Sequence, residues 1–213
     1  MKSAISLDGR IAAKDGSSQW ISSETARLDA HQLRAESQAI VVGSGTAIKD
    51  TPQLTVRLND IALKKPPIRV IVDSQGSTPC EGPLFDINLA PTLILTTEQT
   101  STKIRNNWEK KGVESIVVPQ SKEKVNLKNA WKILAEKGIL QVLVEGGAKL
   151  QTSLFNTSLV NQLTIYKGPL LLGKTGLPMY LNEIESLDVA PRLFVTDVKR
   201  FEDTIRLDYS LKV

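Results

Sequence analysis

Two hydrophobic patterns alternate along the chain from residue 39 onward. Short runs rich in β-branched residues, such as residues 70–72, alternate with longer stretches in which apolar residues recur every three or four positions. The first pattern is typical of strands buried on both faces and the second of amphipathic helices, so their alternation predicts an α/β fold with a mainly parallel sheet. The predicted strands cover residues 39–43, 68–73, 92–96, 113–118, 139–144 and 163–166.

Two helices have clear boundaries in the sequence. The first follows Ser22 or Ser23, whose hydroxyls can cap its free amides, and extends to about residue 36. The second begins near Asn126 and ends at Gly138, because glycine readily adopts the left-handed conformation that closes a helix. The side chains expected to face inward are Ala26, Ala30 and Leu33 in the first helix, and Leu127, Ala130, Trp131 and Leu134 in the second.

The last 20 residues follow a different pattern. Residues 193–200 and 204–211 alternate apolar and polar side chains around a short polar turn, which is typical of an antiparallel hairpin and makes the predicted sheet mixed. We find no internal repeat, low-complexity tract or linker long enough to separate domains. We therefore expect one domain over residues 1–213, with helices flanking the sheet.

Composition excludes several classes of protein. No window approaches the roughly 20 apolar residues that span a bilayer, and the start of the chain does not resemble a secretory signal, so we expect a soluble, cytoplasmic protein without membrane contact. One cysteine, Cys80, and one histidine, His31, are too few to build a zinc site, so we expect no metal. The 27 basic and 23 acidic residues are interleaved and only 5% of residues are aromatic, which argues against nucleic-acid binding.

A pair of glycines follows the predicted strand 139–144. Gly146 and Gly147 would let the backbone approach a ligand, and the amides and positive dipole end of the helix after them attract phosphate. Glu145 lies directly before the glycines. Placing its carboxylate there would cost free energy unless the carboxylate accepts hydrogen bonds or faces a substrate. The alternative is an ordinary tight turn with a solvated glutamate.

Residues 43–48 begin like a dinucleotide-binding fingerprint. They lack its third glycine, where Ile48 stands, and Pro52 soon ends any helix, so a standard Rossmann site is disfavoured. We interpret the segment as a loop that carries the Asp50 carboxylate and the Arg57 guanidinium seven residues apart. A short capped helix with a surface arginine is the alternative.

Other polar residues are ambiguous by themselves. Ser74, after the strand 68–73, could bind the 2′-phosphate of a cofactor or form an ordinary turn. Lys2 and Lys149 are more typical of solvated lysines than of ligands. His31 is more typical of a packing or surface residue than of a base, and Trp20 of a staple that packs onto the helix after it.

Eight short motifs occur in one order along nearly the whole chain. They are SLDGRIA at 6–12, GSSQWI at 16–21, HQLRAE at 31–36, GSGT at 43–46, DTPQLTVR at 50–57, IRVIVDS at 68–74, EGG at 145–147 and GPLLLG at 168–173. Each motif is weak alone, but the ordered set is specific. Together they resemble the reductase domain of the bacterial riboflavin-biosynthesis deaminase/reductase.

The resemblance implies a dihydrofolate-reductase-like fold, a homodimer, and NADPH-dependent reduction of 5-amino-6-(5-phosphoribosylamino)uracil to 5-amino-6-(5-phosphoribitylamino)uracil. Carried over position by position, it implies cofactor contacts from Ala4, Trp20, Thr46, Asp50, Ser74, Gly146, Gly147, Ala148, Lys149, Leu150, Gln151, Thr152 and Ser153. The substrate contacts that it implies are Ser18, Arg34, Leu54, Arg57 and Glu145.

In this hypothesis two arginines clamp the substrate phosphate. The planar guanidinium groups of Arg34 and Arg57 match phosphate oxygens in pairs. Glu145 is the first candidate to orient the substrate, whereas Asp50 and Lys2 are candidates for proton transfer. Glu145 could also relay the proton, and the sequence does not decide among the three groups.

Two departures from the family pattern and two rival functions remain. The family usually has two adjacent acidic residues before the proline, and here Thr51 stands in place of the second. We expect the protein to remain active despite this replacement. The zinc deaminase signature that relatives carry upstream is absent, so we expect an excised domain or a stand-alone reductase. The rivals are a reductase that acts on 2,5-diamino-6-ribosylamino-pyrimidinone 5′-phosphate, and a non-catalytic nucleotide-binding or assembly module.

Overall fold

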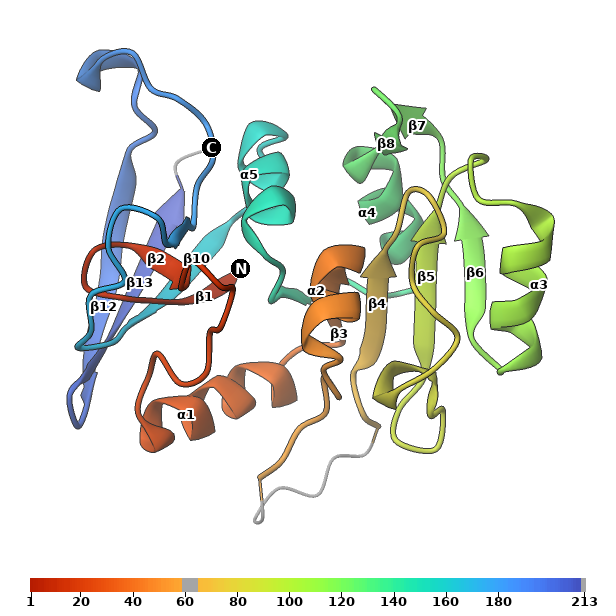
Figure 1. Cartoon of the computed structure of the whole chain (residues 1–213), viewed down its shortest axis with the longest axis horizontal. Helices are drawn as coiled ribbons and strands as arrows, with labels where there is room; N and C mark the ends of the chain where they lie inside the picture. The colour runs from red at the N-terminus through yellow and green to blue at the C-terminus, as the bar shows by residue number, and fades with distance from the viewer. Residues whose placement is uncertain (59–64, 212–213) are drawn as a thin grey trace. The chain divides into compact units, whose positions relative to one another are not determined.

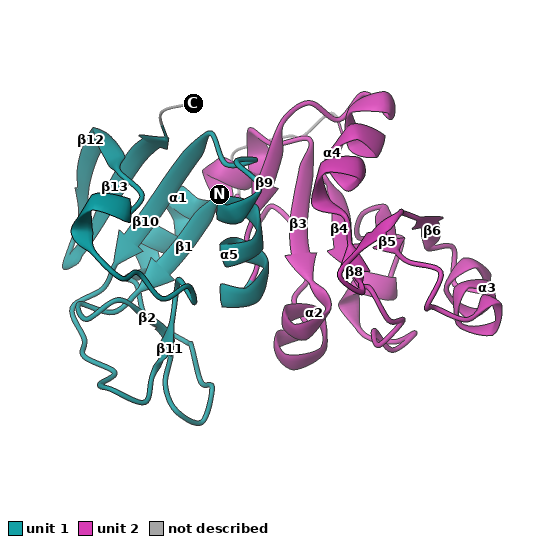
Figure 2. Ribbon diagram, turned by 90° about the horizontal axis from the view of Figure 1, so that it is seen from above, with its two compact units in different colours: residues 1–30, 147–213 teal, residues 31–146 magenta. Residues whose placement is uncertain are grey.

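The computed structural model describes residues 1–58 and 65–211. They form two compact units, shown in Figure 2. Unit 1 contains residues 1–30 and 147–213, and unit 2 contains residues 31–146. Unit 1 is therefore built from both ends of the chain, and unit 2 from its middle. In the described ranges, no helix is both long and apolar enough to cross a bilayer.

Unit 2 contains five of the six predicted strands in one parallel sheet, whereas the sixth, 163–166, lies in a second sheet in unit 1. The strands of the parallel sheet are β3 (Ala39–Gly43), β4 (Ile68–Val72), β5 (Thr92–Thr96), β6 (Glu114–Val117) and β9 (Val142–Val144). They are arranged in the order β6-β5-β4-β3-β9 and every neighbouring pair is parallel (Figure 1; β9 is labelled in Figure 2). Most residues of β3, β4 and β5 are apolar and buried, as the near-continuous β-branched runs predict, and Arg69 of β4 is a buried charge among them.

The remaining elements of unit 2 are short. They are α2 (Ser44–Asp50), α3 (Thr102–Lys110), α4 (Leu127–Glu136), the 3₁₀ helix η1 (Pro83–Phe85) and the hairpin of β7 (Gln120–Ser121) and β8 (Lys124–Val125). The predicted start of α4 is confirmed, since the side chain of Asn126 accepts a hydrogen bond from the Asn129 amide. Trp131 is only half-buried, whereas Trp108 is completely buried in the core of the unit.

The interpretation of residues 43–57 as a loop is wrong over its first half. Residues 44–50 form the helix α2, so the alternative of a short helix is the better description. The helix ends at Thr51, which has a left-handed backbone with φ of 38°. Pro52 lies beyond this end, where its ring and missing N–H no longer oppose helix formation.

The predicted strand 139–144 is shorter than expected. β9 begins only at Val142, because the Gln38 side chain accepts hydrogen bonds from the amides of Leu140 (2.7 Å) and Gln141 (3.0 Å). A glutamine oxygen thus binds the two amides that precede the strand.

Unit 1 contains a separate four-stranded sheet. Its strands are β1 (Lys2–Ile5), β10 (Gln162–Lys167), β12 (Leu193–Phe201) and β13 (Thr204–Leu211), in the order β1-β10-β13-β12. The predicted hairpin at the end of the chain is confirmed as β12 and β13, and only β1 and β10 pair in parallel. The other elements are β2 (Arg10–Ala12), β11 (Leu177–Pro178), α5 (Ala148–Asn156), the 3₁₀ helix η2 (Leu187–Val189) and the first part of α1 (Glu24–Ala35), which continues into unit 2.

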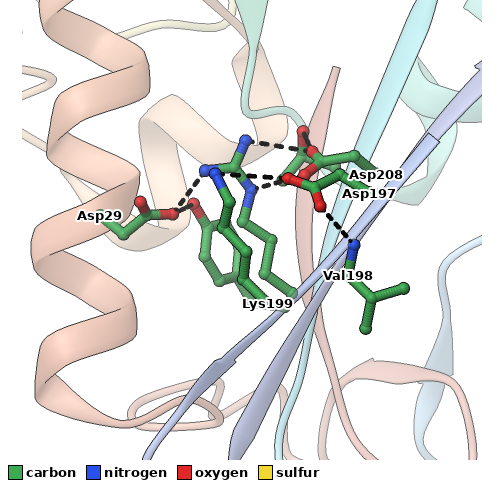
Figure 3. Close-up of polar contacts among 8 residues, drawn as sticks. Asp29, Asp197, Val198, Lys199 and Asp208 are labelled. Atoms are coloured by element: carbon green, nitrogen blue, oxygen red, sulfur yellow. Dashed lines mark hydrogen bonds and ion pairs between the residues drawn. The ribbon is translucent and has the colours of Figure 1, made fainter.

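The two faces of the sheet in unit 1 differ in polarity. One face packs apolar side chains around Leu163 and Ile165. The other face carries a network of charges, shown in Figure 3, in which Arg206 contacts both Asp29 of α1 and Asp208 at 2.8 Å. The Tyr166 hydroxyl donates to Asp29 at 2.5 Å, and burial followed by this hydrogen bond raises the pKa of Tyr166. The network fixes the first half of α1 on this sheet.

Candidate functional site

The carboxyl ends of the parallel strands in unit 2 lie at one edge of their sheet, where open α/β sheets bind ligands. Ser44 follows β3, Asp73 follows β4 and Glu145 follows β9. The register continues past the end of β9, because the Glu145 amide donates to the Val41 carbonyl at 2.9 Å. The topology therefore brings the predicted segments 43–46, 73–74 and 145–146 to the same edge.

Glu145 forms a bidentate ion pair with Arg34. Arg34 Nε lies 2.6 Å from Oε1 and Nη2 lies 2.9 Å from Oε2, and the two side chains are only 14% and 9% exposed. Burial alone would lower the pKa of Arg34, but the contact with Glu145 raises it above its ordinary value. Two predicted substrate residues are thus joined, and the paired donors of Arg34 are occupied by a carboxylate.

Side chains from α1 and β4 hold the loop of residues 53–57 at three backbone atoms. Arg69 Nη1 donates to the Gln53 carbonyl at 3.4 Å, and Arg34 Nη1 donates to the Thr55 carbonyl at 3.0 Å. The Arg57 amide in turn donates to His31 Nδ1 at 3.2 Å. The loop is therefore fixed along its length.

The loop presents one predicted substrate residue to solvent and buries another. Leu54 is 3% exposed, packs into the core of unit 2 and has a positive φ of 50°. The Arg57 side chain is exposed, and its Nη1 reaches Gln53 Oε1 at 3.3 Å. Burial and the nearby Arg34 charge lower the pKa of Arg57, and Glu145 opposes that shift. A second guanidinium thus lies in the electrostatic field of the Arg34–Glu145 pair.

The other predicted residues at this edge belong to α2 and to the turn after β4. Thr46 and Asp50 lie on α2, and burial raises the pKa of Asp50 although Lys49 opposes the shift. Ser74 accepts a hydrogen bond from the Val125 amide at 3.0 Å. The buried Asp73 carboxylate shapes the turn by accepting from the Thr78 amide and hydroxyl, both at 2.7 Å.

In unit 1, the predicted anion site is the start of α5. Gly147 precedes the helix with extended backbone angles, and the first turn carries no acidic residue. The side chains of Leu150, Gln151 and Thr152 are buried, so ligand contacts in this turn would come from backbone amides and from the exposed Lys149. Amides at the positive end of a helix dipole suit a phosphate group.

The remaining predicted residues of unit 1 lie at its first strand and in the segment before α1. The Lys2 ammonium is 5.7 Å from the centre of the Tyr166 ring, and Ala4 pairs with Tyr166 in the sheet. Trp20 is 63% exposed and stacks on Arg27, whose guanidinium lies 4.2 Å from the ring centre. Ser18 is half-buried in the same segment.

Sequence reasoning did not find two residues that shape the loop. His31 was expected to be a packing or surface residue, and Arg69 was not singled out. His31 lies three positions before Arg34, so helical spacing places both on one face of α1. Arg69 interrupts an apolar strand, and a charge in a buried strand needs partners. Either signal could have indicated a structural role.

The comparisons with known proteins agree with the geometry. The family model of the RibD C-terminal domain matches residues 1–206. The riboflavin biosynthesis protein RibD of Chlamydia trachomatis is 44% identical over 207 residues, which cover 97% of this chain and 55% of that protein. The chain thus spans about half the length of the curated relatives that it matches.

Solved structures of related proteins are also similar to this chain. RibD of Acinetobacter baumannii, form 1, superposes with a TM-score of 0.87 at 29% identity, over 100% of this chain and 57% of that one. A Thermotoga maritima protein, named diaminohydroxyphosphoribosylaminopyrimidine deaminase/5-amino-6-(5-phosphoribosylamino)uracil reductase, gives a TM-score of 0.81 at 27% identity, over 99% of this chain and 55% of that one. These similarities confirm the predicted dihydrofolate-reductase-like α/β fold. The chain belongs to the RibD C-terminal domain family.

Proposed function

We propose that this chain is an NADPH-dependent reductase that converts 5-amino-6-(5-phosphoribosylamino)uracil to its phosphoribitylamino product in riboflavin biosynthesis. Family membership and the reductase activity in the name of the Thermotoga maritima relative support the reaction. The observation that carries it is the Arg34–Glu145 ion pair with Arg57 beside it. A fixed carboxylate next to an exposed guanidinium suits a ligand that has both hydroxyl groups and a phosphate.

In this proposal Arg57 rather than Arg34 makes the first contact with the substrate phosphate. Three donors of Arg34 are engaged by Glu145 and by the Thr55 carbonyl, whereas the Arg57 side chain is exposed. Arg34 instead fixes the Glu145 carboxylate, which is then set to accept hydrogen bonds from the substrate. Ser18 and the backbone of Leu54, whose side chain is buried in the core, complete the substrate contacts that we carry over from the family resemblance.

We assign the cofactor contacts to the glycine pair, to the first turn of α5 and to side chains carried over from the resemblance. Amides at the start of α5 and Lys149 would hold phosphate groups, which fits the absence of acidic residues from that turn. Thr46, Asp50 and Ser74 at the sheet edge, and Ala4 and Trp20 in unit 1, complete the set. NADPH supplies the hydride that the reduction requires.

The reaction also needs proton transfer, because the sugar ring must open to an imine before its C1′ carbon accepts a hydride. We propose Lys2 and Asp50 as the two groups that can handle this proton. Lys2 is seated against the Tyr166 ring, which fixes where its ammonium lies. Asp50 has a raised pKa, so its carboxyl group takes up a proton at a higher pH than an ordinary aspartate.

Absorbance at 340 nm tests the proposed reaction. Purified chain with NADPH and 5-amino-6-(5-phosphoribosylamino)uracil is expected to lose absorbance as the cofactor is oxidised. Faster turnover of 2,5-diamino-6-ribosylamino-pyrimidinone 5′-phosphate would favour the rival reductase. Cofactor binding without turnover of either pyrimidine would favour the non-catalytic module.

Arg57→Ala is expected to raise the KM for the pyrimidine about 10- to 100-fold, because a charge-assisted contact to phosphate contributes about 1.5–3 kcal/mol. The KM for NADPH should change less than twofold. Arg192→Ala is the matched control, since Arg192 is an exposed arginine of unit 1. Unchanged steady-state constants in Arg57→Ala would remove this residue from the site.

We further propose that residues 1–213 act as one reductase domain and that the chain is a cytoplasmic homodimer. Exposed apolar side chains of unit 1 support an interface, among them Leu187 (79%), Val189 (66%) and Val195 (58%). Multi-angle light scattering should give twice the chain mass of 23.4 kDa, about 47 kDa. A mass that stays at 23.4 kDa at micromolar concentration would exclude the homodimer.

A further inference from the structure

His31 is the only histidine of the chain and has no part in the function proposed so far. Its side chain is 8% exposed and lies on α1, in the part of that helix that belongs to unit 2. The Nδ1 atom accepts a hydrogen bond from the Arg57 amide at 3.2 Å. A buried imidazole thus holds the backbone of the residue that we assign to the substrate phosphate.

We propose that His31 is a positioning residue: its neutral ring fixes Arg57 for phosphate binding, and its protonation releases the loop. The inference rests on the proposed function in one respect, namely that Arg57 contacts the substrate phosphate.

Of the three anchors of the loop, His31 is the one with an imidazole ring, which can be neutral or protonated. The other two are the guanidiniums of Arg34 and Arg69, which stay protonated at every physiological pH. Imidazole ordinarily titrates near pH 6.5. Protonation of this ring would therefore act on the Arg57 end of the loop and leave the anchors at Gln53 and Thr55 in place.

Protonation of the ring removes the acceptor. Nδ1 can accept the Arg57 amide only while it carries no proton, and an imidazolium has two donors and no acceptor. The added charge also meets other cations. Arg34 lies one helical turn after His31 on α1 and Arg57 lies on the loop, whereas the Glu145 carboxylate after β9 pairs with Arg34. Both effects favour displacement of the loop when His31 is charged.

The position of the Arg57 side chain depends on this backbone contact. The side chain is exposed, and its hydrogen bond to Gln53 is long, at 3.3 Å. Since the guanidinium has little side-chain support, the backbone at residue 57 determines where it lies. Release of the amide from His31 is therefore expected to weaken phosphate binding and to leave the cofactor contacts unchanged.

The pH profile of the pyrimidine KM tests the inference. His31→Asn is the key variant, because the Asn amide oxygen can accept the Arg57 amide in place of Nδ1 and does not titrate. At pH 8 the two proteins should have KM values within twofold of each other. At pH 5.5 the wild-type KM should be about 10-fold above that of His31→Asn. The substrate phosphate also titrates in this range, but it does so equally for both proteins.

His31→Leu is expected to have a raised pyrimidine KM at every pH, about 10-fold at pH 8, with kcat and the KM for NADPH within twofold of wild type. A general loss of packing would change all three constants. Identical pH profiles of KM in wild type and His31→Asn would overturn the inference, whether or not His31→Leu folds.

Amide hydrogen exchange separates the failure of this inference from the failure of the proposed function. After correction for intrinsic exchange rates, a peptide that contains residue 57 should lose protection in the wild-type chain between pH 8 and pH 5.5, and keep it in His31→Asn. This result supports the release of the loop even if no pyrimidine is turned over. Equal protection in both proteins at pH 5.5 would overturn it even in an active reductase.

Discussion

Glu145→Gln is expected to lower kcat/KM for the pyrimidine about 100-fold. Glutamine keeps the shape of the side chain but turns one of the two acceptors of the bidentate contact into an N–H₂ donor that faces the Arg34 guanidinium. Arg34 is only 14% exposed and would be left as a poorly paired charge, which drives it to reorient. The substrate thereby loses both a charged acceptor and the geometry that Arg34 imposes on it. Steady-state kinetics at saturating NADPH measure the loss.

Glu36→Gln is the matched control. Glu36 follows directly after α1 and is exposed, and it accepts a hydrogen bond from Gln32 at 3.1 Å. Its replacement should change kcat/KM less than twofold. Arg34→Lys tests the pair from the other side, because lysine keeps the charge and loses the paired donors. A kcat/KM within threefold of wild type in Glu145→Gln would show that the ion pair is structural only.

The parallel sheet could be predicted from the sequence because its signal is local. Each strand of the parallel sheet lies in a short, largely apolar run that can be recognised without the rest of the chain. Four of the five strands begin and end within one residue of the predicted bounds. The fifth, β9, starts late because the Gln38 side chain binds the two preceding amides, and Gln38 is 102 and 103 residues distant from them in the chain. No local pattern encodes such a contact.

The sequence indicates candidate residues one by one, whereas only the structure shows how some of them are arranged. Arg34 and Glu145 were both expected on the substrate side, but their pairing joins residues 111 positions apart. As separate residues they suggest one guanidinium clamp, formed by Arg34 with Arg57, and one carboxylate that orients the substrate. The pair changes the roles that we propose, because it leaves Arg57 as the exposed cation. The contact between His31 and the loop could not be predicted for the same reason. The partner of His31 is a backbone amide 26 residues away, and a side-chain motif does not indicate such a partner.

Arg69 is the clearest case of a residue whose role the sequence conceals. It lies in β4 among apolar residues and is 0% exposed. Its partners are backbone carbonyls, of Pro83 at 2.7 Å, Asp86 at 2.9 Å and Ala90 at 2.5 Å, together with Gln53 at 3.4 Å. Carbonyls exist at every residue, so composition and motifs give no indication of which ones a buried arginine binds.

Arg69→Met is therefore expected to lower the free energy of unfolding by about 3–5 kcal/mol, because several buried carbonyls lose their donor and an apolar side chain cannot replace it. For a chain of this length the loss corresponds to a fall in melting temperature of about 10 °C. Thermal and urea unfolding, followed by circular dichroism, measure both quantities. The loop of residues 53–57 also loses an anchor, so the KM for the pyrimidine should rise in the folded variant.

Arg105→Met is the control for the same chemical change at the surface of unit 2. The Arg105 guanidinium reaches the Thr102 hydroxyl at 3.3 Å and the exposed Glu98 carboxylate at 3.9 Å, contacts that water can replace. Its loss should cost less than about 1 kcal/mol. If Arg69→Met were destabilised no more than Arg105→Met, the carbonyls around Arg69 would have to find other donors. The buried guanidinium would then not hold residues 83–90 and the loop in place.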